Sequence, residues 1–205
     1  MVKQNKTYGR KMIIGIPVKN FKGAYTRLEH ILSPKERTNL SKALLHNIVD
    51  SFKDLDAKIY LITKDKEVNS YAEKLNISAY TSKILGLNEE AESFLESKHE
   101  RNTPWCMIHS DLPYVNKFTA KHLLNDIRNH KLLASRSEDN GTPLIGGTVK
   151  LNRFHYGKNS FNLHQKEAEK INTQLHILFS KELSFEIDTE KNYLDFKENI
   201  PNWYK

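Results

Sequence analysis

The chain has 205 residues, of which 38% are hydrophobic and 28% are charged. This composition predicts a folded domain with a substantial core, and the apolar runs fall well short of the ~20 residues that cross a bilayer, so no membrane contact is expected. The net charge of +7 favours an anionic partner, but the basic residues are spread along the chain and form no nucleic-acid-binding motif, so phosphorylated small molecules are favoured over nucleic acid.

The N-terminal segment bears on where the protein works. Residues 1–11 are polar and basic and lack the apolar stretch of a secretory signal, so we expect a flexible basic N-terminus there. Residues 12–205 are expected to form one domain. The single cysteine excludes an internal disulfide and any cysteine-based metal cluster, which favours a cytoplasmic location.

Apolar strands alternate with amphipathic helices along most of the chain. The run MIIGIPV predicts a buried strand over residues 12–18. A capping box at Ser33 and Glu36 starts the next helix, in which apolar residues recur every fourth position from Leu40 to Phe52. The elements that follow are expected in the order strand 57–63, helix 65–75, strand 77–81, helix 89–99, strand 105–109 and helix 117–130.

The pattern becomes richer in strands after residue 131. Strands are expected over 131–135, 144–151 and 175–179, with a helix over 160–171 between them and a last helix after Asp188. This alternation predicts an α/β protein, with a mixed, mostly parallel sheet in a single Rossmann-like domain and an antiparallel strand among the later ones. Ligands of open α/β sheets bind beyond the carboxyl ends of the strands, so functional residues are expected directly after strands.

Two aspartates stand at such positions. Asp111 follows strand 105–109, and it could be a ligand of a hard cation such as Mg²⁺ or a turn or N-cap residue; both interpretations stay open. Asp188 precedes the last helix, and its local sequence favours an N-cap role. Together, however, the two carboxylates could share one metal ion with a bound triphosphate.

Three loops have features of phosphate-binding segments. The loop after the first strand fails the P-loop template, but it carries the cations Lys19, Lys22 and Arg27 around a bend at Gly23. The turn at residues 140–142 ends in the hydroxyl of Thr142. The loop at residues 156–160 opens a helix whose N–H groups could hold a phosphate, although a plain helix capped by Ser160 is the favoured interpretation of that loop alone.

Cysteine and histidine point to no other chemistry. Cys106 lies inside an apolar strand and is expected to be a buried small hydrophobe. The histidines, His109, His155 and His164 among them, follow no metal-ligand spacing and are expected to be surface or core residues. No Gly-x-Ser-x-Gly element is present, which disfavours a hydrolase of that class.

Several short motifs follow one another along the chain. In order, they are Ile16-Pro17-Val18-Lys19, Thr26-Arg27-Leu28, Leu32-Ser33-Pro34-Lys35-Glu36-Arg37, Gly86-Leu87-Asn88, Asp111-Leu112-Pro113, Gly141-Thr142, Tyr156-Gly157-Lys158-Asn159-Ser160-Phe161 and Glu186-Ile187-Asp188-Thr189. In order and spacing they resemble the 2-phospho-L-lactate guanylyltransferase family, which includes the phosphoenolpyruvate guanylyltransferases of deazaflavin coenzyme F-420 biosynthesis. The resemblance runs from about residue 13 to residue 196, nearly the whole chain.

The resemblance implies a nucleotidyltransferase of the glycosyltransferase-A-like type, with Mg²⁺ at Asp111 and Asp188. It places the acceptor near three residues, Thr142, Gly157 and Ser160. It places the nucleotide over the opening loop and near Asn88, with Pro17, Val18, Lys19, Lys22, Arg27 and Asn88 as the nucleotide-binding residues.

The implied reaction is guanylyl transfer. A phosphate oxygen of a small phosphorylated three-carbon acid (2-phospho-L-lactate, phosphoenolpyruvate or 3-phosphoglycerate) attacks the α-phosphorus of GTP, and pyrophosphate leaves. Because the acceptor is already anionic, catalysis would consist of positioning and charge neutralisation. The implied catalytic residues are Lys19, Arg27, Asp111 and Asp188. The expected partners are GTP and the phospho-acid, and a homodimer is left open.

Departures from the family pattern keep two other interpretations open. Tyr25 stands where the family carries a lysine, and Pro143 where it carries an amide, while Glu186 is the first acidic residue of the Asp-x-Asp element. One alternative is nucleotidyl transfer to another phospho-metabolite, such as a sugar phosphate, with CTP as an alternative donor. The other is a non-catalytic relative that binds a nucleotide or RNA.

Overall fold

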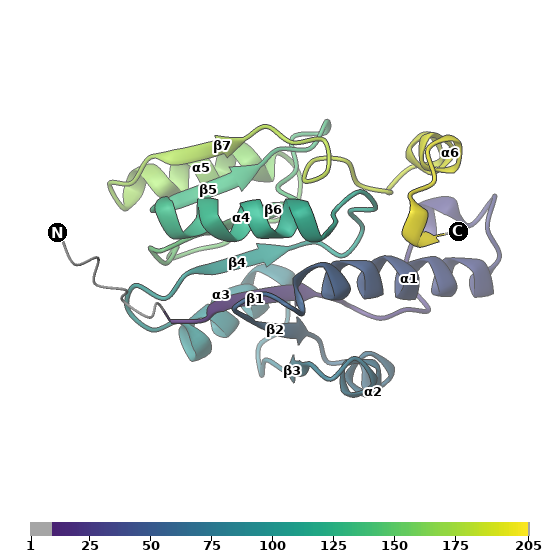
Figure 1. The fold of residues 1–205 in the computed structure, drawn as a ribbon, viewed down its shortest axis with the longest axis horizontal. Helices are drawn as coiled ribbons and strands as arrows, with labels where there is room; N and C mark the ends of the chain where they lie inside the picture. Colours follow the sequence, from purple (N-terminus) through teal and green to yellow (C-terminus); the bar gives the residue numbers. More distant parts are fainter. Residues whose placement is uncertain (1–9, 205) are drawn as a thin grey trace, which may run out of the picture.

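The computed structural model describes residues 10–204, and a seven-stranded sheet lies at its centre (Figure 1). The strands lie in the order β3-β2-β1-β4-β6-β5-β7. Their bounds are β1 (Met12–Pro17), β2 (Ala57–Ile62), β3 (Ser78–Tyr80), β4 (Trp105–Ile108), β5 (Leu132–Ser135), β6 (Leu144–Gly147) and β7 (Leu175–Leu178). Of the flexible segment expected over residues 1–11, residues 1–9 lie outside the described residues.

Each helix expected from the sequence is present. The bounds are α1 (Pro34–Phe52), α2 (Lys66–Lys74), α3 (Leu87–Lys98), α4 (Lys117–Asn129), α5 (Ser160–Lys170) and α6 (Glu190–Glu198), with short 3₁₀ helices η1 (Thr26–Leu28) and η2 (Asn202–Tyr204). The capping box that begins α1 forms as predicted, because the Glu36 N–H donates to Ser33 Oγ at 3.3 Å and the Ser33 N–H donates to the Glu36 carboxylate at 2.8 Å.

The sheet is mixed and mostly parallel, as the sequence predicts. β1 pairs in parallel with both β2 and β4, and β6 runs antiparallel between β4 and β5. The expected strand 144–151 is too long, because β6 ends at Gly147. There the backbone turns with φ 156°, and the N–H groups of Thr148 and Val149 donate to the Lys131 carbonyl at 3.0 and 3.1 Å.

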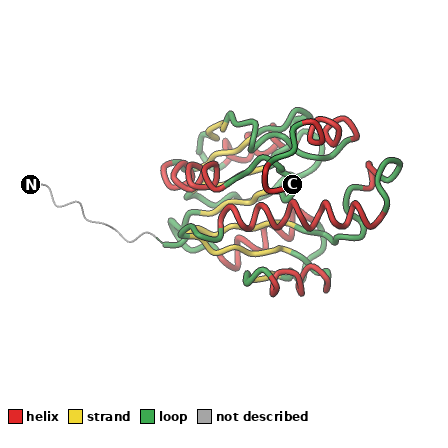
Figure 2. Tube along the Cα trace, turned by 45° about the vertical axis from the view of Figure 1, so that its right-hand side comes forward, coloured by secondary structure: helices red, strands yellow, loops and turns green. Residues whose placement is uncertain are grey.

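Helices cover both faces of the sheet, which Figure 2 shows lying between them. On one face, Ile14 and Ile16 of β1 pack with residues of α1, α2 and α4. On the other face, Ile13 of β1 and Trp105 of β4 pack with α3 and α5. Successive side chains of a strand point to opposite faces, so a strand covered on both faces reads as one continuous apolar run.

A third apolar cluster lies beyond the carboxyl end of β1. It joins the loop around η1, the first half of α1 and the C-terminal helix α6 through Leu28, Leu40, Leu44, Ile187 and Phe196. Each of these five side chains is at most 1% exposed. The cluster holds two segments from opposite ends of the chain beside the edge of the sheet where the ligand is expected.

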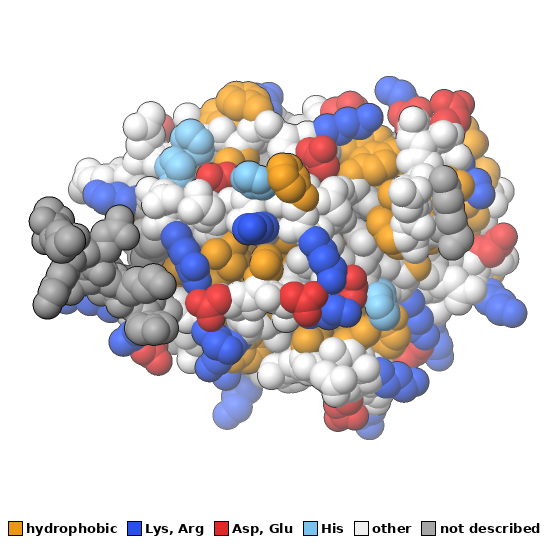
Figure 3. Space-filling view, in the orientation of Figure 1, with side chains coloured by type: hydrophobic (Ala, Val, Ile, Leu, Met, Phe, Trp, Pro, Cys, Tyr) orange, Lys and Arg blue, Asp and Glu red, His pale blue; other side chains and the backbone are white. Residues whose placement is uncertain are grey.

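No helix within residues 10–204 combines the length and the apolar character that a bilayer-crossing segment needs. On the face of the molecule drawn in Figure 3, Lys and Arg side chains are interspersed with Asp and Glu and form no continuous basic stripe. The division into a basic N-terminus, 1–11, and one domain, 12–205, stays a prediction.

Candidate active site

A cavity of about 810 Å³ opens beyond the carboxyl end of β4, at the edge of the sheet where the sequence predicts ligand binding. The turn η1, the loop after β4, the loop between β5 and β6, the start of α5 and the segment before α6 all contribute to its wall. The sequence-predicted residues that line it are Arg27, Asp111, Thr142, Gly157, Ser160 and Asp188.

Backbone hydrogen bonds bring the two aspartate-bearing segments together. The Ile187 N–H donates to the Asp111 carbonyl at 3.1 Å, which ties the segment before α6 to the loop after β4. The His109 N–H donates to the Pro143 carbonyl at 2.8 Å, which ties the end of β4 to the loop between β5 and β6. Three loops that are far apart in sequence therefore share one wall of the cavity.

Asp111, Asp188 and Ser160, which the sequence offered as helix-capping residues, are not N-caps in the structure. Thr189, and not Asp188, is the N-cap of α6, where its side chain accepts from the Asn192 N–H at 3.2 Å. Asn116 caps α4, so Asp111 is free of that role. The capping predicted for Ser160 is also wrong, since α5 begins at Ser160 and its N-cap position is held by Asn159. Thr189 and Asn116 cap their helices through side-chain hydrogen bonds, whereas Asn159 holds its position without one.

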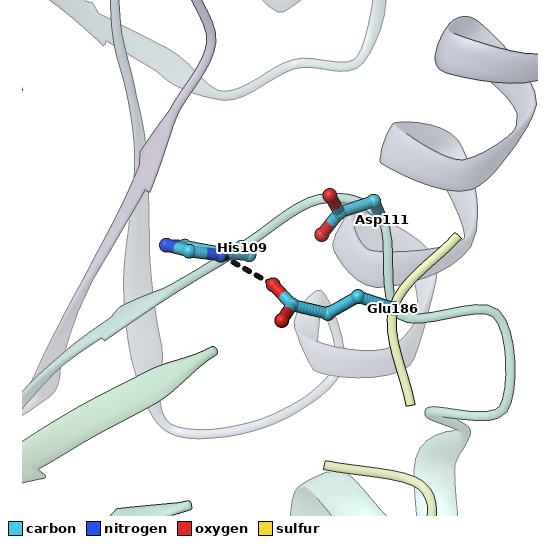
Figure 4. A group of neighbouring side chains, drawn as sticks. All are labelled: His109, Asp111 and Glu186. Carbon is cyan, nitrogen blue, oxygen red and sulfur yellow. Dashed lines mark hydrogen bonds and ion pairs between the residues drawn. The ribbon is translucent and has the colours of Figure 1, made fainter. Parts of the chain in front are cut away.

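Asp111 belongs to a compact group with His109 and Glu186. One ligand atom of each side chain lies within 4.8 Å of the others. Figure 4 shows the three side chains converging from the end of β4 and the segment before α6, with His109 Nδ1 2.7 Å from Glu186 Oε1. Asp111 Oδ1 is buried and has no hydrogen-bond partner among residues 10–204. A buried carboxylate oxygen left unpaired fits a hard cation.

Burial and charge decide the protonation of this group. Burial raises the pKa of Asp111 to about 7, and the charge of Glu186 adds to the rise. Burial opposes protonation of His109, but the hydrogen bond and charge of Glu186 outweigh it and raise the pKa of His109 to about 9. At neutral pH His109 is therefore an internal cation that offsets Glu186, and Asp111 is the member of the group that offers a free oxygen.

Arg27 belongs to η1, and Tyr25 precedes that helix at its N-cap position. The Arg27 guanidinium forms an ion pair with Asp188. Burial raises the pKa of Asp188, although Arg27 opposes the rise. Tyr25 has left-handed backbone angles, φ 55° and ψ 40°, which bulky side chains rarely adopt. Burial raises the pKa of Tyr25, and the charges of Asp111, Asp188 and Glu186 add to the rise, so the Tyr25 hydroxyl lies within electrostatic reach of these carboxylates.

Two of the predicted acceptor residues, Thr142 and Ser160, form a second group that is buried, whereas Gly157 is exposed. Thr142 Oγ1 lies 2.9 Å from Ser160 Oγ and 3.0 Å from His164 Nδ1. The His155 N–H donates to His164 Nε2 at 2.9 Å. Burial lowers the pKa of His164 to about 3, so the ring is neutral at physiological pH. Gly157, beside them, has φ 126°, a conformation that favours glycine.

The remaining predicted nucleotide residues lie outside the lining of this cavity. Val18 is buried in the core, while Lys19 and Lys22 are exposed on the loop after β1. Pro17 ends β1 and is partly buried. Asn88 uses its side-chain amide to bind the backbone of Tyr156, donating to the carbonyl at 3.3 Å and accepting from the N–H. Asn88 thus fixes the loop that carries Gly157, and nucleotide contacts by these residues stay predictions.

Two histidines in the site were missed by sequence reasoning. His109 stands two residues before Asp111, at the end of the same strand, so its position was the available signal. His164 stands four residues after Ser160 and therefore on the same face of α5. Both positions indicated a functional role for these histidines. The lack of metal-ligand spacing did not exclude other roles, such as hydrogen bonding or charge compensation.

Comparisons with known proteins agree with this architecture. The family model described as guanylyl transferase CofC like matches residues 12–197. A 2-phospho-L-lactate guanylyltransferase of Methanosphaera stadtmanae is 30% identical over 189 residues, covering 89% of this chain and 82% of that protein. The protein of the same name from Methanocaldococcus jannaschii is 30% identical over 186 residues, covering 90% and 81%.

A solved structure supports the fold. A protein from Desulfovibrio desulfuricans G20, assigned as a nucleotide-diphospho-sugar transferase, superposes with a TM-score of 0.78 at 14% identity, covering 94% of this chain and 89% of that one. The expected nucleotidyltransferase fold is thereby confirmed. At that identity the likeness concerns the fold and leaves substrates open.

Proposed function

The chain belongs to the CofC-like family of guanylyl transferases, and from this premise we propose that it transfers GMP from GTP to a small phosphorylated three-carbon acid. The acceptor in this proposal is 2-phospho-L-lactate, phosphoenolpyruvate or 3-phosphoglycerate, pyrophosphate is released, and the product serves the biosynthesis of coenzyme F-420. The name shared by the relatives, 2-phospho-L-lactate guanylyltransferase, makes 2-phospho-L-lactate the first acceptor to test.

One observation carries the proposal: Asp111 and Asp188 reach the same cavity as Arg27 and the hydroxyls of Thr142 and Ser160. Nucleotidyl transfer needs positive charge around the phosphates and a separate place for the acceptor. Arg27, together with a cation that the two carboxylates would hold, would supply the positive charge at one wall, and the hydroxyl pair supplies candidates for the acceptor site at another. A binding protein without catalysis would have no need of both.

A divalent cation, proposed here as Mg²⁺, fits the donor set. Asp111 Oδ1 is buried without a partner among the described residues, and the half-buried Asp188 lines the same cavity. Oxygen ligands of this kind suit hard cations. Asp111 and Asp188 would hold the ion, which when bound supplies positive charge that offsets the charge of the phosphate oxygens.

The basic side chains complete the proposed phosphate site. Arg27 pairs with Asp188 through an exposed contact, so a triphosphate offers it an alternative partner that it can bind bidentately. Lys19 is proposed to bind the β- and γ-phosphates from the loop after β1, with Lys22 as a weaker candidate. Because the acceptor phosphate is already anionic, these residues position and neutralise charge, and no general base is required.

The proposed acceptor site lies at Thr142, Gly157 and Ser160. Both hydroxyls line the cavity although their side chains are almost fully buried. A Cβ added at Gly157 would meet no atom within 4 Å, so the glycine is there for its backbone angles and leaves its surroundings open. An acid that carries a phosphate and a carboxylate would find hydroxyl and backbone donors here.

An assay panel tests the function. GTP and CTP are each combined with 2-phospho-L-lactate, phosphoenolpyruvate, 3-phosphoglycerate and sugar phosphates, with and without Mg²⁺, and pyrophosphate release is measured with mass analysis of the product. We expect release with GTP and a three-carbon phospho-acid, dependent on the cation. Nucleotide binding without pyrophosphate release from any pair would reject the proposal in favour of a non-catalytic relative.

A second candidate function is transfer to a different phospho-metabolite, and Tyr25 favours keeping it. Tyr25 stands where the family pattern carries a lysine, within electrostatic reach of the carboxylates. Loss of a cation beside the nucleotide is a change that could alter the donor or the acceptor. In the same panel, release with CTP and a sugar phosphate alone would identify this activity. A homodimer and a cytoplasmic location stay predictions.

A further inference from the structure

A buried hydrogen-bond chain stands behind the proposed acceptor site. It runs from the backbone N–H of His155 to His164 Nε2 at 2.9 Å, from His164 Nδ1 to Thr142 Oγ1 at 3.0 Å, and from there to Ser160 Oγ at 2.9 Å. Thr142, Ser160 and His164 are 1%, 2% and 0% exposed. Bulk water therefore does not compete, and each donor in the chain needs a partner within it or in the cavity.

The backbone fixes which nitrogen of His164 carries the proton. A neutral imidazole has one donor nitrogen and one acceptor nitrogen. The His155 N–H can only donate, so His164 Nε2 has to be the acceptor and Nδ1 has to carry the hydrogen. Nδ1–H then donates to Thr142 Oγ1. This assignment follows from the geometry alone, and the deep burial of the ring agrees with its being neutral.

The direction set by His164 leaves one hydroxyl proton over. Thr142 and Ser160 have two hydroxyl protons between them, and the bond that joins them uses one. His164 Nδ1 donates to Thr142, so it cannot accept a hydrogen bond from either hydroxyl. Among residues 10–204 no further acceptor within hydrogen-bond distance is recorded for either hydroxyl, and both residues line the cavity. The remaining proton is therefore available to a ligand in the cavity.

We propose that His164 is a positioning residue that makes the Thr142–Ser160 pair a hydrogen-bond donor toward an anionic oxygen of the acceptor, either phosphate or carboxylate. The inference rests on the proposed function, because it assigns a role at the acceptor site of that reaction. His164 does not touch the acceptor. It acts through Thr142, by supplying a hydrogen that would otherwise have to come from one of the two hydroxyls.

The opposite tautomer explains why the direction matters. With the proton on Nε2, the ring would face the His155 N–H donor with another donor, and Nδ1 would accept from Thr142. Ser160 would then donate to Thr142, and the pair would present only lone pairs to the cavity. A site of that kind repels an anion, whereas the direction set by the His155 N–H attracts one.

The tautomer is measured first, on the wild-type protein. Long-range ¹H–¹⁵N NMR spectra of histidine-labelled protein, assigned with the His164→Asn variant, distinguish Nδ1-protonated, Nε2-protonated and doubly protonated rings. We expect His164 to be neutral and protonated at Nδ1 at pH 7. A ring protonated at Nε2 or at both nitrogens would overturn the proposal, and this result does not depend on any enzymatic activity.

Two matched variants then test the role. His164→Asn and His164→Leu both remove the acceptor of the His155 N–H, but the asparagine amide can still donate to Thr142 and the leucine cannot. We expect His164→Leu to raise the KM for the phospho-acid at least about tenfold, with the KM for GTP within about twofold of wild type. His164→Asn should restore most of the loss. In a Thr142→Val background, His164→Leu should add little, because it acts through Thr142.

Three results would count against the inference: equal impairment of the two variants, a parallel rise in the KM for GTP, or additive effects in the Thr142→Val background. Circular dichroism and thermal unfolding check that the variants are folded. If the wild type transfers no nucleotide to any phospho-acid, the proposed function fails by itself. The same variant comparison is then made on the binding of inorganic phosphate by ³¹P NMR titration, with the same ordering expected.

Discussion

Arg27 and Asp188, which lie 161 residues apart in the sequence, form an ion pair at the cavity. The pair joins the first loop of the protein to the segment before its last helix. Both side chains are substantially exposed, at 67% and 49%. An exposed pair of this kind contributes little to stability, so its value lies in what the two groups do when a ligand separates them.

Replacing Arg27 should therefore separate stability from activity. We expect Arg27→Gln to change the free energy of unfolding by no more than about 1 kcal/mol, because the pair is exposed. We expect kcat/KM for GTP to fall by about a hundredfold or more, because a charge-assisted contact to the phosphates is lost. Urea unfolding measures the free energy of unfolding, and pyrophosphate release measures kcat/KM for GTP. Arg128→Gln, which breaks an exposed pair with Asp56 away from the cavity, is the control and should keep full activity.

Asp111 should affect stability and activity in opposite directions. Its folded pKa is raised to about 7 from an ordinary value near 3.8, so its stability contribution is fully present below pH 3.8 and is lost as the pH rises through 7. At pH 8 without a divalent cation, Asp111→Asn is therefore expected to be more stable than wild type by about 1–3 kcal/mol, measured by urea unfolding. Turnover should be abolished.

The effect of Mg²⁺ on the melting temperature tests whether Asp111 binds the cation. Mg²⁺ should raise the melting temperature of wild type by binding the folded state, and it should leave Asp111→Asn unchanged. Asp54→Asn, at an exposed carboxylate paired with Lys117, serves as the control. Wild-type turnover by Asp111→Asn at saturating Mg²⁺ would remove Asp111 from the proposed metal site.

His164 predicts a loss of stability in mild acid. Its folded pKa is lowered to about 3 from an ordinary 6.5, so the unfolded state binds the proton more tightly and stability falls as the pH drops below 6.5. Between pH 7.5 and pH 5.5 this one group should lower the free energy of unfolding by about 1.4 kcal/mol. His164→Asn should lack that part of the pH dependence; an identical profile for the two proteins would contradict the buried neutral ring.

Tyr25 can be tested by restoring the cation of the family pattern. Tyr25→Lys places a positive charge beside Asp111, Asp188 and Glu186, where it competes with a bound cation. We expect the Mg²⁺ concentration for half-maximal activity to rise several-fold, because one added positive charge repels the bound cation across a partly solvated site. Tyr25→Phe keeps the ring and removes only the hydroxyl, so its Mg²⁺ dependence should stay near that of wild type.

The sequence predicted the fold well because most of its information is local. The capping box at Ser33, the four-residue stripe of α1 and the apolar runs of β1 and β4 each depend on neighbouring residues. The end of β6 did not follow from such patterns. It is set by hydrogen bonds to the carbonyl of Lys131, which directly precedes the neighbouring strand β5. Strand lengths in the sheet are decided by pairing partners, which a single segment does not reveal.

The site was predicted in part for the same reason. Asp111, Thr142, Ser160 and Asp188 stand at strand ends or loop turns, and the fold class alone brings such positions to one edge. The link between His109 and Glu186 spans 77 residues, and no local rule pairs a core-like histidine with one acidic residue among many. Asn88 shows the same limit from another side: its amide binds the backbone of Tyr156, which no local pattern indicates, while its nucleotide contact stays a prediction.

The hydrogen bond from Ile187 to the Asp111 carbonyl has a consequence for how the site is divided along the chain. All strands of the described sheet end by residue 178, yet one wall of the site comes from the segment that follows them. A version of the protein cut before residue 185 would contain every one of these strands and lack Glu186 and Asp188. A single truncation would thus separate the sheet from the proposed metal ligand Asp188.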